Sequence, residues 1–340
     1  MSFQQFDTLR TVSAADLLSN PPVPRAMILA PWLRERDAVL LWAPTGAGKS
    51  QVAMSAALAV AGGVEVLGWT APEPRPVLYV DGEMDRGDLV ERLELLRHAT
   101  NPPIDAQALG RLHFLARDCH GPDVQFPDLS TPEGHALILA QAKACGAALV
   151  ILDNLSTLAT VEDENSAAAI KPVMDLVQKL RQQGCTPFVV HHASKGGENY
   201  RGTSNIATTF AWIVGLKPTP GAPAGLMDVA MVWQKTRGGA NEATVEKRVR
   251  LRADASRAAW DHGPSEHSQA AALAQAIRSR KWINVEEAGK AIGLQKTRAY
   301  ELKREILAAE LMREVEMDRA FKEAKALREE IGNPNRSLDF

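Results

Sequence analysis

Residues 43–50, which read APTGAGKS, have the residue types and the spacing of a loop that binds phosphate groups. An apolar run, residues 38–44, leads into this loop, and an alanine-rich stretch typical of a helix, residues 51–63, follows it. Glycines allow backbone N–H groups to turn inward around phosphate oxygens, and the start of a helix adds the positive end of its dipole. In this pattern Lys49 reaches the β- and γ-phosphates and Ser50 holds Mg²⁺. The segment therefore predicts a site for ATP and Mg²⁺.

The loop departs at one position from the usual GxxxxGK[ST] pattern, because Ala43 stands where the pattern has its first glycine. Gly46 and Gly48 still allow the loop to turn, so we treat this departure as minor. A chance glycine turn before a helix is the alternative, but strand, loop and helix follow in the order that the motif requires. The residues expected to bind the nucleotide are Pro44, Thr45, Gly46, Ala47, Gly48, Lys49, Ser50 and Gln51.

Carboxylates stand at the ends of two further apolar runs. Asp153 ends the run ALVILD, where an aspartate can bind the magnesium shell through water, and Glu83 follows the run VLYV. At that place a carboxylate can orient or deprotonate an attacking water. Parallel strands bring their carboxyl ends to one edge of a sheet, so we expect both groups near Lys49. Asp81 is the rival for the role of base, and each acid alone is also compatible with a simple strand-end cap.

Two adjacent histidines occur in residues 189–202, which read VVHHASKGGENYRG. Side chains alternate along a strand, so His191 and His192 are expected to face opposite ways and cannot share one role. We interpret His191 as a packed, hydrogen-bonded histidine. His192 lies nearer the predicted catalytic edge. A metal site is not supported, because no further ligands follow at a useful spacing.

The elements that position these groups are apolar runs that alternate with amphipathic stretches over residues 36–217. This alternation predicts a mainly parallel sheet with helices on both faces. Residues 226–237 and 247–256 follow with little helix between them, and they are expected to form antiparallel strands at the edge of the sheet. The predicted fold class is α/β, a P-loop NTPase with a central, mainly parallel sheet, followed by a small helical domain.

Together the motifs resemble the RecA-type ATPase core, and most closely the RepA-type and DnaB-type hexameric replicative helicases, over about residues 26–260. The resemblance implies that Glu83 is the catalytic glutamate and that Asp153 is the magnesium-associated aspartate. It places His192 where these proteins have a residue that reports the γ-phosphate. The loop that follows occupies the position that binds single-stranded DNA, with Lys195 and Arg201 as the residues that could hold DNA phosphates.

The segment QKTRGG, residues 234–239, resembles the KxR-G segment of DnaB-type helicases. The resemblance implies that Lys235 and Arg237 reach across a subunit boundary toward the γ-phosphate of a neighbour. Their i, i+2 spacing at a strand end directs both side chains the same way. The alternative is an ordinary basic turn at the end of a surface hairpin.

The chain divides by composition into three parts, an N-terminal arm at 1–25, the ATPase domain at 26–262 and a helical domain at 263–340. Prolines interrupt the arm. Residues 278–313 carry nine basic and five acidic side chains and have the pattern of a helix-turn-helix or small winged-helix module, whose second helix starts near Gln295. This part lies outside the resemblance. It is compatible with duplex DNA or with a replication protein or neighbouring subunit as its partner.

The overall composition excludes some classes of protein. A net charge of −2 over 340 residues gives no broad basic surface for DNA or for a membrane, so nucleic-acid contacts must be local. The three cysteines lie far apart, which favours a reducing compartment and no structural zinc. The first ten residues lack the apolar segment typical of a signal sequence, and no apolar run approaches the roughly 18 residues that cross a bilayer. We expect a cytoplasmic protein.

The expected function is an ATP-driven, ring-forming translocase on single-stranded DNA, a helicase for the replication of a plasmid, phage or other mobile element. The expected assembly is a homo-oligomer, a hexameric ring. One alternative is a DNA-stimulated ATPase without unwinding, such as a recombination mediator or a KaiC-like regulator. Another is a DNA-binding initiator or repressor without enzymatic activity, against which the set of Lys49, Glu83 and Asp153 argues.

Overall fold

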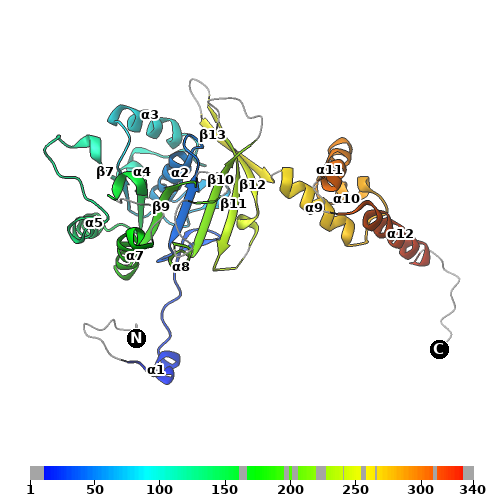
Figure 1. The fold of residues 1–340 in the computed structure, drawn as a ribbon, viewed down its shortest axis with the longest axis horizontal. Helices are drawn as coiled ribbons and strands as arrows, with labels where there is room; N and C mark the ends of the chain where they lie inside the picture. Colours follow the sequence, from blue (N-terminus) through cyan, green and yellow to red (C-terminus); the bar gives the residue numbers. More distant parts are fainter. Residues whose placement is uncertain are drawn as a thin grey trace.

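In this computed structural model, the parts of the chain described are residues 11–160, 167–194, 199–200, 206–219, 227–239, 241–253, 258–264, 266–308 and 312–331. A core of helices packed around a sheet is followed by a separate group of helices at the C-terminal end (Figure 1). No helix among these residues is both long enough and apolar enough to cross a membrane.

Nine strands of the described residues form the central sheet, in the order β13-β12-β11-β10-β3-β9-β8-β6-β7. The strands from β10 to β7 are mutually parallel, and those from β10 to β13 pair antiparallel. The bounds are β3 Val39–Ala43, β6 Val77–Asp81, β7 Leu112–Ala116, β8 Leu149–Asp153, β9 Thr186–His192, β10 Trp212–Pro218, β11 Asp228–Thr236, β12 Lys247–Ala253 and β13 Ala258–Pro264. Two antiparallel pairs lie outside this sheet: β1 Met27–Leu29 with β2 Leu33–Arg34, and β4 Glu65–Val66 with β5 Trp69–Thr70.

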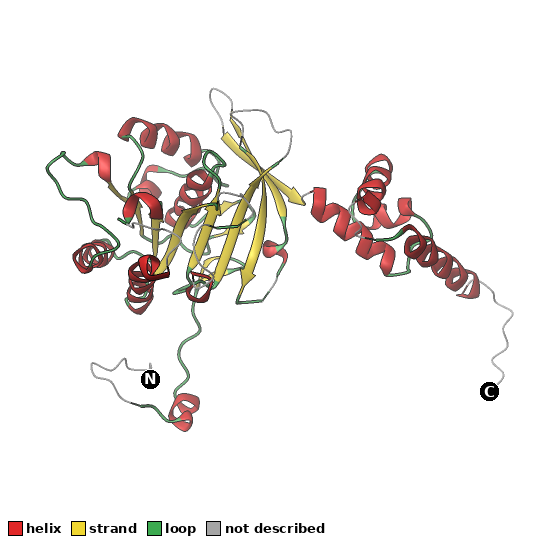
Figure 2. Cartoon of the chain, viewed as in Figure 1, coloured by secondary structure: helices red, strands yellow, loops and turns green. Residues whose placement is uncertain are grey.

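The sheet is covered on both faces, which explains why its central strands are continuous apolar runs. Every residue of β3, β6 and β8 is buried. Alternate side chains enter two different cores: Val39 and Leu41 pack with α2 (Lys49–Gly62), whereas Leu40 packs with α7 (Ala167–Gln182). The sheet therefore separates two layers of helices, as Figure 2 shows.

The remaining helices of the core are short or lie toward the outside of these layers. Their bounds are α3 Arg86–Arg97, α4 Ala106–Leu109, α5 Pro132–Ala144, α6 Leu155–Leu158 and α8 Ile206–Thr209, with 3₁₀ turns η1 Arg117–Cys119 and η2 Glu242–Thr244. Residues of α3 and α4 join the core on the side of α2, and residues of α5 join the core on the side of α7.

The C-terminal helices have a hydrophobic core of their own. They are α9 Glu266–Arg278, α10 Val285–Ala291, α11 Lys296–Ala308 and α12 Glu314–Ile331, and we call them the helical module. The described residues beyond β13 contain no strand, so the helix-turn-helix has no wing in this part of the chain. Together with the mainly parallel sheet, these helices confirm the predicted fold class.

The structure also differs from the sequence-based prediction in three elements. Strand β10 pairs parallel with β3 and antiparallel with β11, so it joins the parallel and antiparallel parts of the sheet. Strand β13 forms the outer edge of the antiparallel part. Neither strand was predicted. A short helix, α1 (Ala14–Ser19), lies within the predicted proline-interrupted arm. It forms because Ser13 caps it through the N–H of Asp16, and the prolines come only after its end.

Candidate nucleotide-binding site

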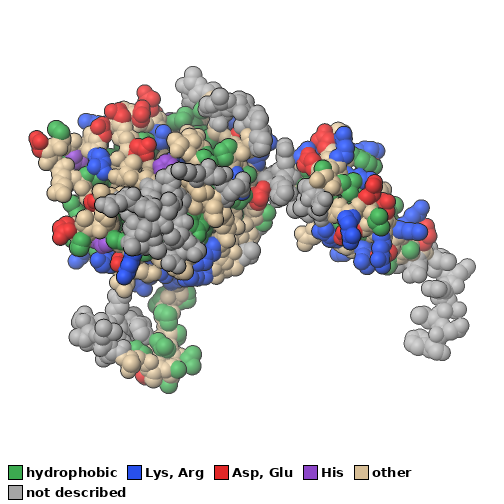
Figure 3. Space-filling view, in the orientation of Figure 1, with side chains coloured by type: hydrophobic (Ala, Val, Ile, Leu, Met, Phe, Trp, Pro, Cys, Tyr) green, Lys and Arg blue, Asp and Glu red, His purple; other side chains and the backbone are tan. Residues whose placement is uncertain are grey.

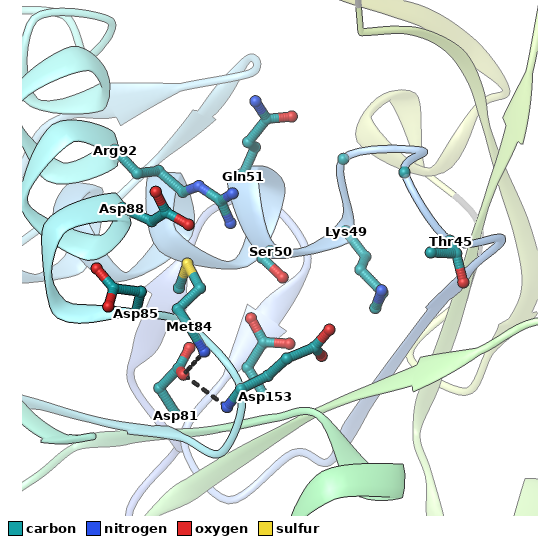
Figure 4. A pocket seen from close by; sticks show the side chains of 13 residues that line it. Thr45, Lys49, Ser50, Gln51, Asp81, Met84, Asp85, Asp88, Arg92 and Asp153 are labelled. Carbon is teal, nitrogen blue, oxygen red and sulfur yellow. Dashed lines mark hydrogen bonds between the residues drawn. The ribbon is translucent and has the colours of Figure 1, made fainter. Parts of the chain in front are cut away.

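A pocket lies where the carboxyl ends of β3, β6 and β8 meet the start of α2 (Figure 4). This is the edge at which parallel α/β sheets bind their ligands. The pocket is lined by Thr45, Gly46, Gly48, Lys49, Ser50, Gln51, Asp81, Glu83, Met84, Asp85, Asp88, Arg92 and Asp153. Of the residues predicted to bind nucleotide, Pro44 and Ala47 are not among those that line it.

The phosphate loop depends on two glycines with left-handed backbone conformation. Gly46 has φ +79° and Gly48 has φ +88°, and a Cβ added at Gly48 would meet the side chains of Met227 and Gln51. Helix α2 starts at Lys49 without a side-chain cap, so its first N–H groups remain available to a phosphate. Ala43 is the last residue of β3 and is not among the residues with positive φ, so the backbone at this position does not require glycine.

Lys49, Ser50 and Asp153 lie around the same opening of the pocket (Figure 4). Lys49 and Asp153 are buried, at 8% and 3% exposed. Burial raises the pKa of Asp153, while hydrogen bonds from Tyr79 and Ser50 and the charge of Lys49 lower it. The Tyr79 hydroxyl donates to Oδ2 of Asp153 at 2.5 Å, which fixes the orientation of this carboxylate. The glycine cradle, the ammonium group and the hydroxyl–carboxylate pair suit a nucleoside triphosphate with Mg²⁺.

The geometry separates the two carboxylates that competed for the role of base. Oδ1 of Asp81 accepts the N–H groups of Glu83 at 2.9 Å and Met84 at 2.7 Å, so it holds the turn after β6. Asp81 is 1% exposed, and burial raises its pKa to about 6. Glu83 is exposed, and its Oε2 accepts a hydrogen bond from Nδ2 of Asn154 at 2.5 Å. Both acids line the pocket, and Glu83 is the more exposed of the two.

The two histidines occupy different surroundings at the end of β9. His191 is 0% exposed and lies beside Trp42 in the sheet register. His192 lies beside Ala43, and its Nδ1 is 3.5 Å from the hydroxyl oxygen of Thr45 in the phosphate loop. The end of β9 thus contacts the phosphate loop directly through His192.

The residues predicted to act across subunits lie at the end of β11, and neither is among the residues that line the pocket. The guanidinium of Arg237 donates to the carbonyl oxygen of Thr208 at 3.1 Å. Burial lowers the pKa of Lys235, and the nearby charge of Arg237 adds to this effect. Lys195 and Arg201, predicted to hold DNA, lie outside the described residues.

Several residues of the site were not predicted from the sequence. Arg92, Asp88 and Asp85 line the pocket from α3 and its N-cap, and Figure 4 shows them on the side away from Lys49 and Thr45. Tyr79 and Asn154 form hydrogen bonds to the carboxylates of Asp153 and Glu83. Both residues have a recognisable position in the sequence. Tyr79 lies two residues before Asp81 on the same strand, and Asn154 directly follows Asp153.

A phosphate loop before α2, with acids at the ends of neighbouring strands, defines the class of P-loop ATPases. The family described as an AAA domain matches residues 4–198, which is more than half of the chain, and the chain belongs to that family. Among solved structures, the chain is similar to the KaiC-like protein PH0186 from the hyperthermophilic archaeon Pyrococcus horikoshii OT3. The two are 16% identical with a TM-score of 0.48, over 71% of this chain and 100% of that chain.

Proposed function

We propose that this ATPase is an ATP-driven translocase on single-stranded DNA, which assembles as a hexameric ring and acts as a DNA helicase. In this role it would serve the replication of a plasmid, phage or other mobile element. The observation that carries the proposal is the contact between His192 and Thr45, which joins the phosphate loop to the segment after β9.

Binding of ATP would use the backbone N–H groups of the phosphate loop and the side chain of Lys49. Ser50 and Asp153 would hold Mg²⁺, with Asp153 acting through water. The metal ion, when bound, would neutralise charge on the phosphate oxygens. Tyr79 keeps Asp153 in place for this role, because its hydroxyl donates to that carboxylate.

Hydrolysis would depend on Glu83, which would orient the attacking water and take up its proton. Its hydrogen bond to Asn154 positions the carboxylate before the nucleotide arrives. Asn154 directly follows Asp153, so the two acids of the site are tied to each other through adjacent residues of one strand end. Asp81 has a different part, since its oxygen supports the turn on which Glu83 lies.

Coupling to DNA would run through β9. His192 lies within reach of the phosphate loop, so a change at the γ-phosphate would alter its contact with Thr45. The segment that starts with the next residue carries Lys195 and Arg201, whose side chains would hold DNA phosphates. A shift of the strand end would then move the DNA contacts.

Assembly would complete the site. Lys235 and Arg237 are not among the residues that line the pocket of their own subunit, which fits a role toward the pocket of a neighbour. An arginine supplied in this way adds roughly 10³- to 10⁵-fold to the rate of phosphoryl transfer. Hydrolysis would therefore require the ring.

The test is the ATPase rate of the full chain alone, with single-stranded DNA and with duplex DNA, together with a strand-displacement assay. We expect single-stranded DNA to raise the rate and strands to separate. Arg237→Ala should keep ATP binding and lower turnover by about 10³-fold or more. Arg252→Ala, which removes an exposed arginine paired with Asp261, is the matched control and should stay near wild type.

Each outcome decides between the functions. DNA-stimulated hydrolysis without strand displacement would replace the helicase by a recombination mediator or a regulatory ATPase. Absence of hydrolysis would leave a DNA-binding initiator or repressor. A strict monomer in light scattering, with and without an ATP analogue, would remove the ring and the role of Arg237.

A further inference from the structure

Helices α10 and α11 pack as a helix-turn-helix at very close range. A Cβ added at Gly289 would lie 2.5 Å from the Cβ of Ala299, so this approach requires glycine. Gly293 has φ +78° and forms the turn between the two helices, and the N–H of Leu294 returns to the carbonyl of Gly289. These interactions fix the orientation of α11 relative to α10.

One face of α11 is left exposed by this packing. Ala299, Leu302 and Ile306 are buried in the core of the module. Lys296, Tyr300 and Arg304 follow one another at intervals of four residues, so they form a stripe along the helix, and all three are exposed. Tyr300 is 45% exposed and places an aromatic ring between the two basic side chains of the stripe.

The two glutamates of α11 pair with an arginine that is not part of this stripe. Glu301 and Glu305 both pair with Arg298, at 3.0 Å and 3.3 Å. Arg298 lies on the side that faces the ATPase core, where it lines a pocket together with Arg248 and Arg250. Lys296 pairs with Glu286 at 2.7 Å, but both side chains reach solvent, so the lysine can exchange this carboxylate for a phosphate.

The net charge of residues 278–313 differs in sign from that of the whole chain. Residues 278–313 have four more basic than acidic side chains, whereas the whole chain has a net charge of −2. Figure 3 shows Lys and Arg side chains at several places on the visible face of the module. The module as a whole carries nearly equal numbers of basic and acidic side chains, so the feature that is complementary to a polyanion is the exposed stripe of Lys296, Tyr300 and Arg304.

We propose that the helical module binds duplex DNA, with α11 in the major groove and Lys296, Tyr300 and Arg304 as the residues that contact it. In helix-turn-helix proteins the second helix enters the major groove and its N-terminal residues read base edges. The N-terminal residues of α11 are Lys296 and Thr297, which can donate to bases, and Arg304 lies two turns further, within reach of the phosphate backbone.

This inference does not depend on the proposed helicase function, because the module and the nucleotide pocket use different residues. The module follows β13 at the edge of the sheet that is remote from β7, and Figure 1 shows it beside the core. A duplex held there would place the ATPase at a chosen site on DNA, whatever the ATPase then does.

The experiment selects duplexes from a random pool with the full-length chain in the absence of nucleotide, then measures affinity by fluorescence anisotropy at fixed salt. We expect a shared sequence to emerge. The double variant Lys296→Ala/Arg304→Ala should bind the selected duplex about tenfold or more weakly, because each side chain that binds a base or a phosphate strengthens binding severalfold. Tyr300→Ala should also weaken binding and changes no charge.

The matched control is Lys322→Ala/Lys325→Ala, which removes two exposed lysines from α12. It should bind the selected duplex almost as the wild type does. A chain with Lys49→Ala should also bind it, which separates a failure of this inference from a failure of the proposed ATPase function. If no sequence is selected, or if both double variants bind equally, the inference is overturned.

Discussion

The nucleotide pocket and the helical module use charge in opposite ways. In the pocket Asp81 and Asp153 are buried, and burial raises the pKa of Asp153 and brings that of Asp81 to about 6. In the module the acids lie at the surface, and hydrogen bonds from Arg328 and Arg278 lower the pKa of Glu287 and Glu316. Desolvated charges suit chemistry because their interactions are strong, whereas surface pairs that can exchange suit recognition of another charged molecule.

The two regions also differ in how they are assembled. Lys49 begins α2, Glu83 follows β6 and Asp153 ends β8, so these three residues are spread over more than a hundred residues of the chain. The exposed face of α11 comes from a single helix held by its neighbour. Changes in one region should therefore leave the other intact, and this separation can be tested.

Among the variants that separate the two regions, the largest effect is expected for Glu83→Gln, which keeps the shape of the side chain but removes its ability to accept a proton. Turnover of ATP should fall by roughly 10²- to 10⁴-fold, while ATP binding and binding of duplex DNA by the module remain. Steady-state ATPase assays and nucleotide titration measure this. Glu91→Gln, an exposed position on α3, is the control. Unchanged turnover in the Glu83 variant would return the role of base to Asp81.

A smaller effect is expected for Gly289→Val, which forces a branched side chain between α10 and α11. A Cβ there already lies 2.5 Å from that of Ala299, so the module should be destabilised by about 1 to 3 kcal/mol. Hydrogen exchange should speed up in α10 and α11 but not in β3 or β8. Ala291→Val, at an exposed position of the same helix, is the control. Equal exchange in both variants would contradict the close packing.

An effect that appears only at alkaline pH concerns Lys247, on strand β12, which lies next to the edge strand β13. Its Nζ donates to the carbonyl of Leu67 and lies 4.8 Å from the ring centroid of Trp69. Burial lowers the pKa of Lys247 to about 8, while the unfolded chain keeps the ordinary lysine value of 10.5. Above pH 8 the unfolded state thus binds more protons, so stability rises with pH until about 10.5.

Lys247→Met removes this titration. Between pH 8 and 10 the free energy of unfolding of the wild type should rise relative to that of the variant. The expected increase is at most about 1.4 kcal/mol per pH unit. Urea unfolding at several pH values measures the difference. Lys143→Met, at an exposed position on α5, should show no such gain. Parallel pH profiles for the wild type and Lys247→Met would contradict the lowered pKa.

Much of the fold could be predicted because its signals are local. The apolar runs at β3, β6, β7, β8 and β9 are each bounded by turn or helix residues, and all five are strands. The phosphate loop could be predicted as well, since its glycines and Lys49 act through the backbone of one short segment. Strands β10 and β13 were missed because their sequences, WIVGLKP and AAWDHGP, contain glycine and proline and read as connecting segments.

The sequence by itself determined the phosphate loop, the acids at the strand ends and the helix-turn-helix, because each depends on residues that are close in the chain. Only the tertiary structure shows how differently Asp81 and Glu83 are held and exposed. Asp81 is held by the turn it supports, and Glu83 is held by Asn154 from a different strand. Likewise Tyr79 reaches Asp153, and His192 reaches Thr45, across neighbouring strands. Such interactions depend on sheet order and register, which no local pattern specifies.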